Sequence, residues 1–247
     1  MRQVIHRFYS CLLLFTLILP GIAEAGIQVT GTRFIYPESK REIIVNLNNT
    51  SNHPSLVQAW LDAGDPTSLP GALKLPFVIL PPLVRVEAGK GQSLRIIHTK
   101  DHSLPQDRES VFWLSILDVP PRAKGLEGKN IMQMAFRTRL KLFYRPEGLV
   151  GSPKSAAEAL KWSVVPKGQS YVLSVRNDAA YHVSFSRVVL TAGNKTFNLD
   201  AGGMVKPHET YNFPLKGAAS PISSGVVEGY WLDDFGSSRR VKYTLNP

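Results

Sequence analysis

Short runs in which apolar and polar residues alternate dominate the chain after its first 25 residues. Such alternation is typical of β-strands that are buried on one face only. Turn-forming Pro, Gly and Asn residues separate the runs at fairly regular spacing, which is typical of an all-β sandwich. The runs predicted as strands in the first half are Ile43–Leu47, Ser55–Leu61, Leu83–Glu87, Ser93–His98, Ser110–Leu117 and Met132–Tyr144.

The second half of the chain repeats this pattern. Its predicted strands are Tyr171–Asn177, Tyr181–Thr191, Thr196–Leu199, Thr210–Phe213, Val226–Leu232 and Arg239–Leu245. Between the halves, Arg145-Pro146-Glu147-Gly148 ends the longest run, so we expect one domain over residues 26–146 and another over residues 147–247. Each holds roughly 100 residues, the usual size of an immunoglobulin-like sandwich. The sequence therefore predicts an all-β protein of two immunoglobulin-like β-sandwiches.

The first 25 residues have the three parts of a secretory signal peptide. Arg2 and Arg7 supply the positive start, Cys11–Leu19 is the apolar core, and Ala23-Glu24-Ala25 is a small-x-small cleavage site. A membrane anchor is the alternative, but the apolar run is too short to span a bilayer. We expect the mature chain to begin near Gly26, to be soluble, and not to insert into a membrane.

Charge and cysteine content limit the partners and the chemistry. Removal of residues 1–25 leaves a net charge of +9, and a basic surface attracts acidic partners of any kind. Nucleic acid is one option, but an exported protein seldom meets it, so we expect none and favour an acidic protein or lipopolysaccharide. The only cysteine, Cys11, lies in the signal peptide, so the mature chain can form no disulfide and depends on core burial.

Three separated segments carry the clearest indication of function. They are GTRFIY at Gly31–Tyr36, LPQDRESVFWLSILDVPP at Leu104–Pro121 and RTRLKLFYRP at Arg137–Pro146. In this order and spacing they resemble the N-terminal domain of the periplasmic pilus chaperones, which carry fimbrial subunits to an outer-membrane usher. The resemblance implies two sandwiches set at an angle with a cleft between them. It also implies a periplasmic binding protein rather than an enzyme, with neither ATP nor a metal as cofactor.

Two basic residues, Arg33 and Lys141, are candidates for binding an anion. From spacing alone, both are better interpreted as ordinary exposed strand residues. Two cations near an interdomain cleft would nevertheless suit one carboxylate. The resemblance favours this second interpretation. In the family, the arginine of the T-R-x-x-Y segment and the lysine two residues before F-Y-R-P anchor the C-terminal carboxylate of the subunit, and Arg33 and Lys141 occupy those positions.

Alternate residues of the long run Met132–Tyr144 form one largely apolar face. Alternation cannot distinguish a core face from a face kept for a partner, and unaided it favours the core. The resemblance implies donor-strand complementation, in which apolar side chains early in this strand fill the groove of an incomplete subunit. The residues placed on this groove-filling strand are Met132, Met134, Phe136, Thr138 and Leu140. The sequence leaves open whether the free protein caps this strand by self-association.

A third set of residues, Arg95, Glu109 and Asp234, is an expected interdomain salt-bridge cluster. Nothing in the sequence brings these residues together, and without the family they are better interpreted as three unrelated surface charges. The resemblance places all three in the family's domain-orienting cluster. There the role would be structural, because such a cluster fixes the angle between the two sandwiches.

The chain departs from the family pattern at a few points. Ser115 stands where Asn is usual, and Asp233-Asp234-Phe235-Gly236 replaces the more common N-D-Y-G. The loop from Pro121 to Met132 favours the short-loop subclass, although it is slightly long for it. Two other classes of protein remain as alternatives. A fimbrial adhesin or sugar-binding sandwich would need a terminal donor segment or an aromatic sugar pocket, and a hydrolase would need a catalytic constellation; the sequence displays none of these.

Overall fold

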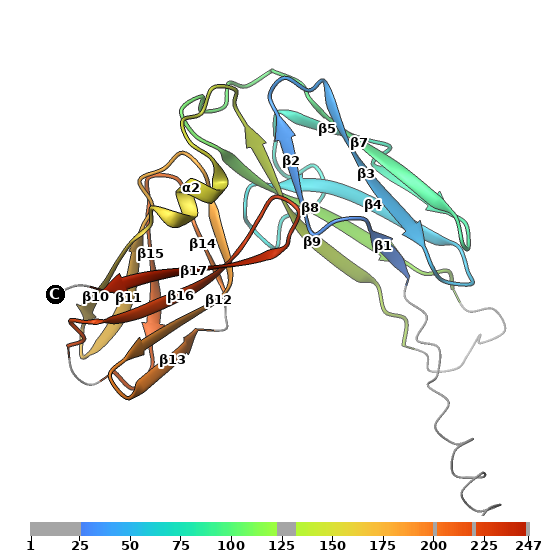
Figure 1. Cartoon of the computed structure of the whole chain (residues 1–247). Helices are drawn as coiled ribbons and strands as arrows, with labels where there is room; N and C mark the ends of the chain where they lie inside the picture. Colours follow the sequence, from blue (N-terminus) through green and yellow to red (C-terminus); the bar gives the residue numbers. More distant parts are fainter. Residues whose placement is uncertain (1–25, 123–131, 200–201, 219–220, 246–247) are drawn as a thin grey trace, which may run out of the picture.

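The computed structural model describes residues 26–122, 132–199, 202–218 and 221–245. The predicted signal peptide and most of the loop between Pro121 and Met132 lie outside the described residues. Figure 1 shows two lobes made almost entirely of strands and set at an angle to each other. The elements of the first lobe are β1 (Ile27–Val29), β2 (Arg33–Pro37), β3 (Glu42–Asn49), β4 (Ser55–Asp62), β5 (Phe77–Leu80), β6 (Leu83–Val86), β7 (Gly91–His98), β8 (Ser110–Val119) and β9 (Phe136–Arg145).

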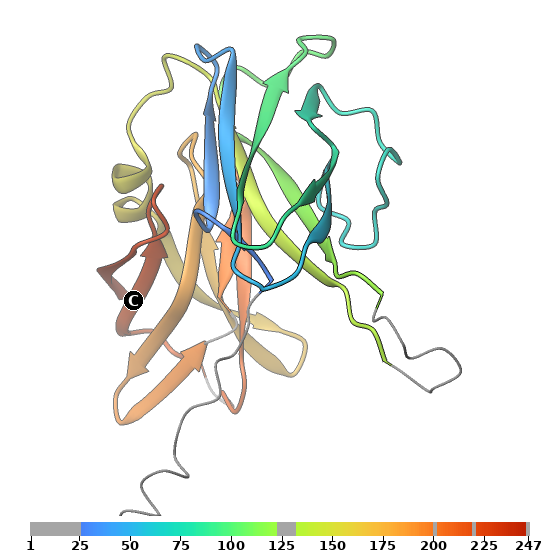
Figure 2. The same ribbon diagram turned by 90° about the vertical axis from the view of Figure 1, so that its right-hand side faces the viewer.

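Two sheets form the first domain. One has the strand order β1-β3-β7-β5, and the other has the order β2-β9-β8-β4-β6. Alternate residues of each strand point between the sheets, where Tyr36, Leu94, Leu114 and Leu142 are fully buried. The pairing of β2 with β9 is parallel, whereas both neighbours along β8 are antiparallel. Figure 2 shows β8 (green) and β9 (yellow-green) lying side by side through the domain.

The second lobe is a smaller sandwich with its own core. Its elements are α2 (Pro153–Glu158), β10 (Lys161–Lys167), β11 (Ser170–Arg176), β12 (Val183–Ala192), β13 (Lys195–Leu199), β14 (Gly203–Val205), β15 (Thr210–Leu215), β16 (Gly225–Leu232) and β17 (Ser238–Leu245). One sheet has the order β10-β11-β15 and the other β13-β12-β16-β17, with β14 paired to β12. Ser152 caps α2 and Pro153 occupies its first turn, which is a favourable start for a short helix.

The predicted all-β fold with two sandwiches is confirmed. No described strand is shared between the sheets of the two lobes. No helix in the described part of the chain has the length and hydropathy needed to cross a membrane.

One strand is shorter than the prediction. The alternating run begins at Met132, but β9 begins at Phe136. Its antiparallel partner β8 ends at Val119, and the last pair along the ladder is Asp118 with Phe136. Two prolines follow Val119, and they have no N–H to donate to a ladder. The pattern of side chains therefore continues past the point where main-chain pairing stops.

Candidate functional site

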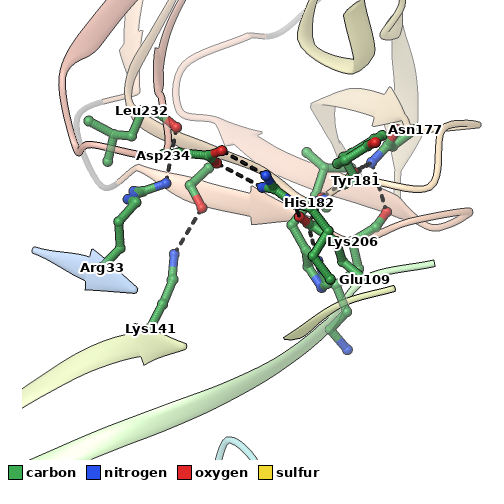
Figure 3. A network of polar contacts seen from close by, with 12 residues as sticks. Arg33, Glu109, Lys141, Asn177, Tyr181, His182, Lys206, Leu232 and Asp234 are labelled. Carbon is green, nitrogen blue, oxygen red and sulfur yellow. Dashed lines mark hydrogen bonds and ion pairs between the residues drawn. The ribbon is translucent and has the colours of Figure 1, made fainter. Parts of the chain in front are cut away.

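The structure brings the two predicted anchor residues side by side. Arg33 on β2 and Lys141 on β9 are direct partners in the parallel ladder. Figure 3 shows both side chains extending from their strands toward the second domain. The Arg33 Nη1 donates a 3.0 Å hydrogen bond to the carbonyl of Leu232, and the Lys141 Nζ donates a 3.2 Å bond to the hydroxyl of Ser184. Two cations thus share one small region between the domains.

The electrostatic environment of this pair favours binding of an anion. Burial lowers the pKa of Lys141 to about 8, and the charge of Arg33 adds to the effect. Burial also lowers the pKa of Arg33. The Nε of Arg33 is buried, and among the described residues it has no hydrogen-bond partner. A carboxylate between the two side chains would supply the missing acceptor and offset the repulsion between the two charges.

An unpaired strand edge leads away from the two cations. β2 pairs with β9 only from Lys141 to Arg145, so no described strand covers the outer edge of β9 from Phe136 to Leu140. Such an edge presents free N–H and C=O groups to a further strand. The unpaired edge ends where β2 begins to cover β9, at Lys141. A further strand that pairs with this edge in parallel would therefore terminate beside Arg33 and Lys141.

The two faces of β9 differ in what they contact. The guanidinium groups of Arg137 and Arg139 stack on the rings of Trp60 and Trp113, at 4.6 and 4.2 Å. Arg139 also forms an ion pair with Asp62, whose side chain is 0% exposed. As far as Arg139, this face is therefore occupied by contacts within the domain, whereas Lys141 on the same face bonds to Ser184 of the second domain.

The opposite face is largely free at the start of the strand and is buried at its end. Met132, Met134 and Phe136 are 89%, 59% and 62% exposed, whereas Leu142 is 0% exposed. Thr138 and Leu140 lie between them and are half-buried. The face thus passes from exposed apolar side chains into the core. Exposed Met and Phe residues in a row are typical of a surface that a partner covers.

The structure brings Glu109 and Asp234 together through Arg145. The Arg145 Nε donates to Glu109 Oε1 at 2.8 Å, and its two Nη atoms donate to the two oxygens of Asp234, both at 2.8 Å. Burial alone would lower the pKa of Arg145, but the hydrogen bonds and charges of Asp234 and Glu109 outweigh it and raise that pKa. Glu109 and Arg145 belong to the first domain and Asp234 to the second, so this cluster joins the domains.

The prediction that Arg95 belongs to this cluster is wrong. Arg95 lies on β7, in the other sheet, and forms an exposed ion pair with Glu42 across the β3–β7 ladder. Its side chain therefore reaches along its own sheet rather than toward the second domain. Arg145 takes the central place instead. The signal for it was present in the sequence, because Arg145 is the arginine of the F-Y-R-P segment that ends the first domain.

His182 and Ser184 also belong to this region, and no sequence pattern indicated a role for either residue. The His182 N–H donates a 2.8 Å hydrogen bond to Glu109 Oε2, and its ring nitrogen Nδ1 lies 3.2 Å from the same oxygen. The side chains of Glu109 and His182 are 2% and 3% exposed. A backbone bond from Glu109 to Ala180 adds to the same contact. Glu109 is therefore held firmly between the two domains.

Two family models together match most of the chain. Residues 26–150 match the model described as "Pili and flagellar-assembly chaperone, PapD N-terminal domain". Residues 155–243 match the model described as "Pili assembly chaperone PapD, C-terminal domain". The chain belongs to the pilus assembly chaperone family. Its members are chaperones rather than enzymes, and the resemblance drawn from the three sequence segments is confirmed.

Alignments with individual relatives cover most of the chain. The probable fimbrial chaperone YadV of Escherichia coli K12 is 41% identical over 216 residues, which are 87% of each chain. The chaperone protein MrkB of Klebsiella pneumoniae is 39% identical over 236 residues, covering 94% of this chain and 97% of MrkB. The crystal structure of the YadV chaperone superposes with a TM-score of 0.77 over 90% of this chain and 100% of YadV, at 39% identity.

A second solved structure contains a relative together with its partner. In the complex of the Salmonella enterica SafA pilin with the SafB chaperone, the matched chain aligns with a TM-score of 0.74 and 28% identity. The alignment covers 89% of this chain and 96% of the matched chain.

Proposed function

We propose that this chaperone captures fimbrial subunits in the periplasm by donor-strand complementation. The observation that carries the proposal is the position of Arg33 and Lys141 at the end of the unpaired edge of β9. A subunit's C-terminal carboxylate binds between the two cations. Its last strand then pairs with β9 from Leu140 back to Phe136, a length of about 16 Å at about 3.3 Å per residue.

Exposed apolar side chains at the start of β9 and just before it complete the subunit. Met132, Met134 and Phe136 fill the groove left by the subunit's missing strand. Each apolar side chain that becomes fully buried stabilises the complex by about 1.5–3 kcal/mol, before the cost of ordering is subtracted. Main-chain hydrogen bonds along β9 supply affinity that depends little on the subunit's sequence, and the groove-filling side chains supply selectivity.

Delivery to an outer-membrane usher completes the proposed cycle. A relative that appears in a complex with a pilin supports a fimbrial subunit as the partner. Bound subunits keep their groove filled until the usher exchanges the chaperone strand for another. No ATP or metal enters this scheme, because the free energy for the exchange is stored in the incomplete fold of the subunit.

The anchor is tested by replacing Arg33→Ala and Lys141→Ala separately. Each variant is co-expressed with a candidate subunit, and the amount of subunit that co-purifies is measured. We expect a loss of about tenfold or more for either variant, since each removes a charge-assisted hydrogen bond worth about 1.5–3 kcal/mol. Thermal unfolding of the purified variants checks that both remain folded.

Arg95→Ala is the matched control. Arg95 is an arginine of the same domain whose ion pair with Glu42 is exposed and lies outside the site. It should retain normal subunit yield. Equal yields from all three variants would refute the carboxylate anchor, and a loss in Arg95→Ala alone would point to a different surface.

A further inference from the structure

The first residue of the described chain, Gly26, packs against a buried carboxylate. The N–H of Ile27 donates a 2.9 Å hydrogen bond to Oδ2 of Asp118. The backbone and side chain of Thr50 both donate to the Gly26 carbonyl, at 3.2 and 3.1 Å. A Cβ atom built on Gly26 would lie only 2.2 Å from Asp118 Oδ2. The position therefore holds the backbone closely and admits no side chain without a shift.

Within the described part of the chain, Asp118 lacks a complete set of partners. It lies one residue before the end of β8, on the face where Leu114 and Ile116 are buried, and it is 7% exposed. Its Oδ1 is buried and receives no hydrogen bond from any residue in the described part of the chain. An ionised carboxylate in such surroundings is costly unless a cation or further donors compensate it. The structure thus indicates a place for one more positively charged donor.

We propose that removal of the signal peptide creates this donor. Hydrolysis of the Ala25–Gly26 bond adds water, leaves a carboxylate on Ala25 and frees the amine of Gly26. The amine takes up a proton near neutral pH, because α-amino groups have pKa values of about 7.7–8.0. Its nitrogen is one bond from the Gly26 Cα and so within about 5 Å of Asp118. The new terminus is free to rotate about the Cα–C bond of Gly26, which places the ammonium within reach of the Asp118 carboxylate.

The resulting ion pair would make the stability of the first domain depend on removal of the signal peptide. In the precursor, position 26 offers a single amide N–H and no charge, whereas the mature terminus offers an ammonium with three donors. The pair ties β1 to the end of β8, where Asp118 is also the ladder partner of Phe136. The cleaved chain therefore has a more stable first domain than the uncleaved chain. This inference is independent of how the subunit binds.

The test compares two chains in two backgrounds. One chain begins at Gly26, and the other keeps Ala25 in front of it, which moves the ammonium by one residue. Both are prepared with Asp118 and with Asp118→Asn, and urea unfolding is measured. We expect the extension to lower the folding equilibrium constant about tenfold or more with Asp118, and less than twofold with Asp118→Asn. An equal loss in both backgrounds, or no loss in either, would overturn the proposal.

Two further measurements keep the test decisive if Asp118→Asn does not fold. The first is the rate at which acetic anhydride acetylates the Gly26 amine in the folded and the urea-unfolded chain. An ion-paired amine should react at least tenfold more slowly when folded, and equal rates would contradict the pair. The second is the mass of the exported protein, which must match a chain that starts at Gly26. Any other start removes the basis of the inference.

Discussion

At the scale of single residues, the basic side chains along β9 differ more in their contacts than in residue type. Arg137 and Arg139 stack on tryptophan rings, and Arg139 is neutralised by the buried Asp62. Lys141 also lies over the ring of Trp113, at 5.3 Å, but its hydrogen bond goes to a hydroxyl and the like charge of Arg33 lies beside it. The sequence displays all three as the polar positions of one alternating run. The resemblance to the pilus chaperones had already selected Lys141, and the structure shows how its contacts differ from those of the two arginines.

The pKa of Lys141, about 8, makes the proposed anchor dependent on pH. A bound carboxylate favours the charged form of Lys141. The affinity of the chaperone for the subunit's C-terminal carboxylate is therefore fully present well below pH 8 and decreases as the pH rises through 8. We expect affinity for a peptide copied from a subunit's C-terminal strand to fall about tenfold between pH 7 and pH 9, since each unit of pH above the pKa removes about tenfold of the charged form.

Lys141→Arg provides the control for this titration, because arginine stays charged over the whole range. Fluorescence anisotropy at several pH values measures both proteins. The variant should bind with a flat profile, and a flat profile for the unaltered protein would show that Lys141 does not contact the carboxylate.

The ion pair between Arg139 and the buried Asp62 is expected to stabilise the first domain. Arg139→Ala leaves the carboxylate of Asp62 buried, with Arg137 at 3.7 Å and a 2.8 Å hydrogen bond from the N–H of Gly64 as its remaining contacts. Removing one partner of a buried pair costs about 3–5 kcal/mol. Urea unfolding should show a loss toward the lower end of this range, because Arg139 is partly exposed. Arg85→Ala, which breaks an exposed pair with Glu87, should cost less than about 1 kcal/mol. Similar losses from both variants would contradict this account.

At the scale of elements, side-chain alternation predicted most of the long strands, but it missed β1, β5, β10 and β14 and said little about pairing. The pattern located β8 and β9 to within a few residues, because one buried face forces a period of two. It predicted the end of β8 to within two residues, but it did not show that β9 loses its partner there, and so it extended β9 back to Met132. It also gave no information on which strand neighbours β9. The parallel partner β2 lies about 100 positions earlier in the chain, and the open edge depends on where that partner ends.

The exposed start of this strand leads to a prediction that separates binding from folding. Met134 is 59% exposed and precedes β9, so Met134→Glu should leave the thermal midpoint unchanged within about 2 °C. Subunit capture should fall about tenfold or more, because a carboxylate would enter an apolar groove. Co-purification and thermal unfolding measure the two effects.

Leu142→Glu is the matched comparison on the same face of the strand. Leu142 is 0% exposed, so a buried carboxylate there should destabilise the first domain by several kcal/mol. A large loss of thermal stability in Met134→Glu as well would assign Met134 to the domain's own core and not to a partner.

At the scale of the whole molecule, the two sandwiches are joined by a compact polar cluster whose centre the sequence did not identify. Glu109 and Asp234 were expected there, and both are present. The family resemblance assigned Arg95 on β7 to the place between them, whereas the structure has Arg145 there and pairs Arg95 with Glu42. Arg145 is the last residue of β9, and its guanidinium bonds to Asp234 of the second domain. His182 completes the cluster from a turn that carries no recognisable motif.

This cluster should hold the angle between the domains, and Asp234→Ala tests that role. The change removes both hydrogen bonds between Arg145 and Asp234 but leaves the pair of Arg145 with the buried Glu109. Because fewer contacts then join the two domains, the angle between them should vary more. Small-angle scattering should therefore show a larger radius of gyration, while each sandwich stays folded. Subunit capture should also weaken, since Arg33 is positioned by the carbonyl of Leu232 close to the altered turn. Arg95→Ala should scatter like the unaltered protein, and an identical curve for Asp234→Ala would mean that backbone contacts alone orient the domains.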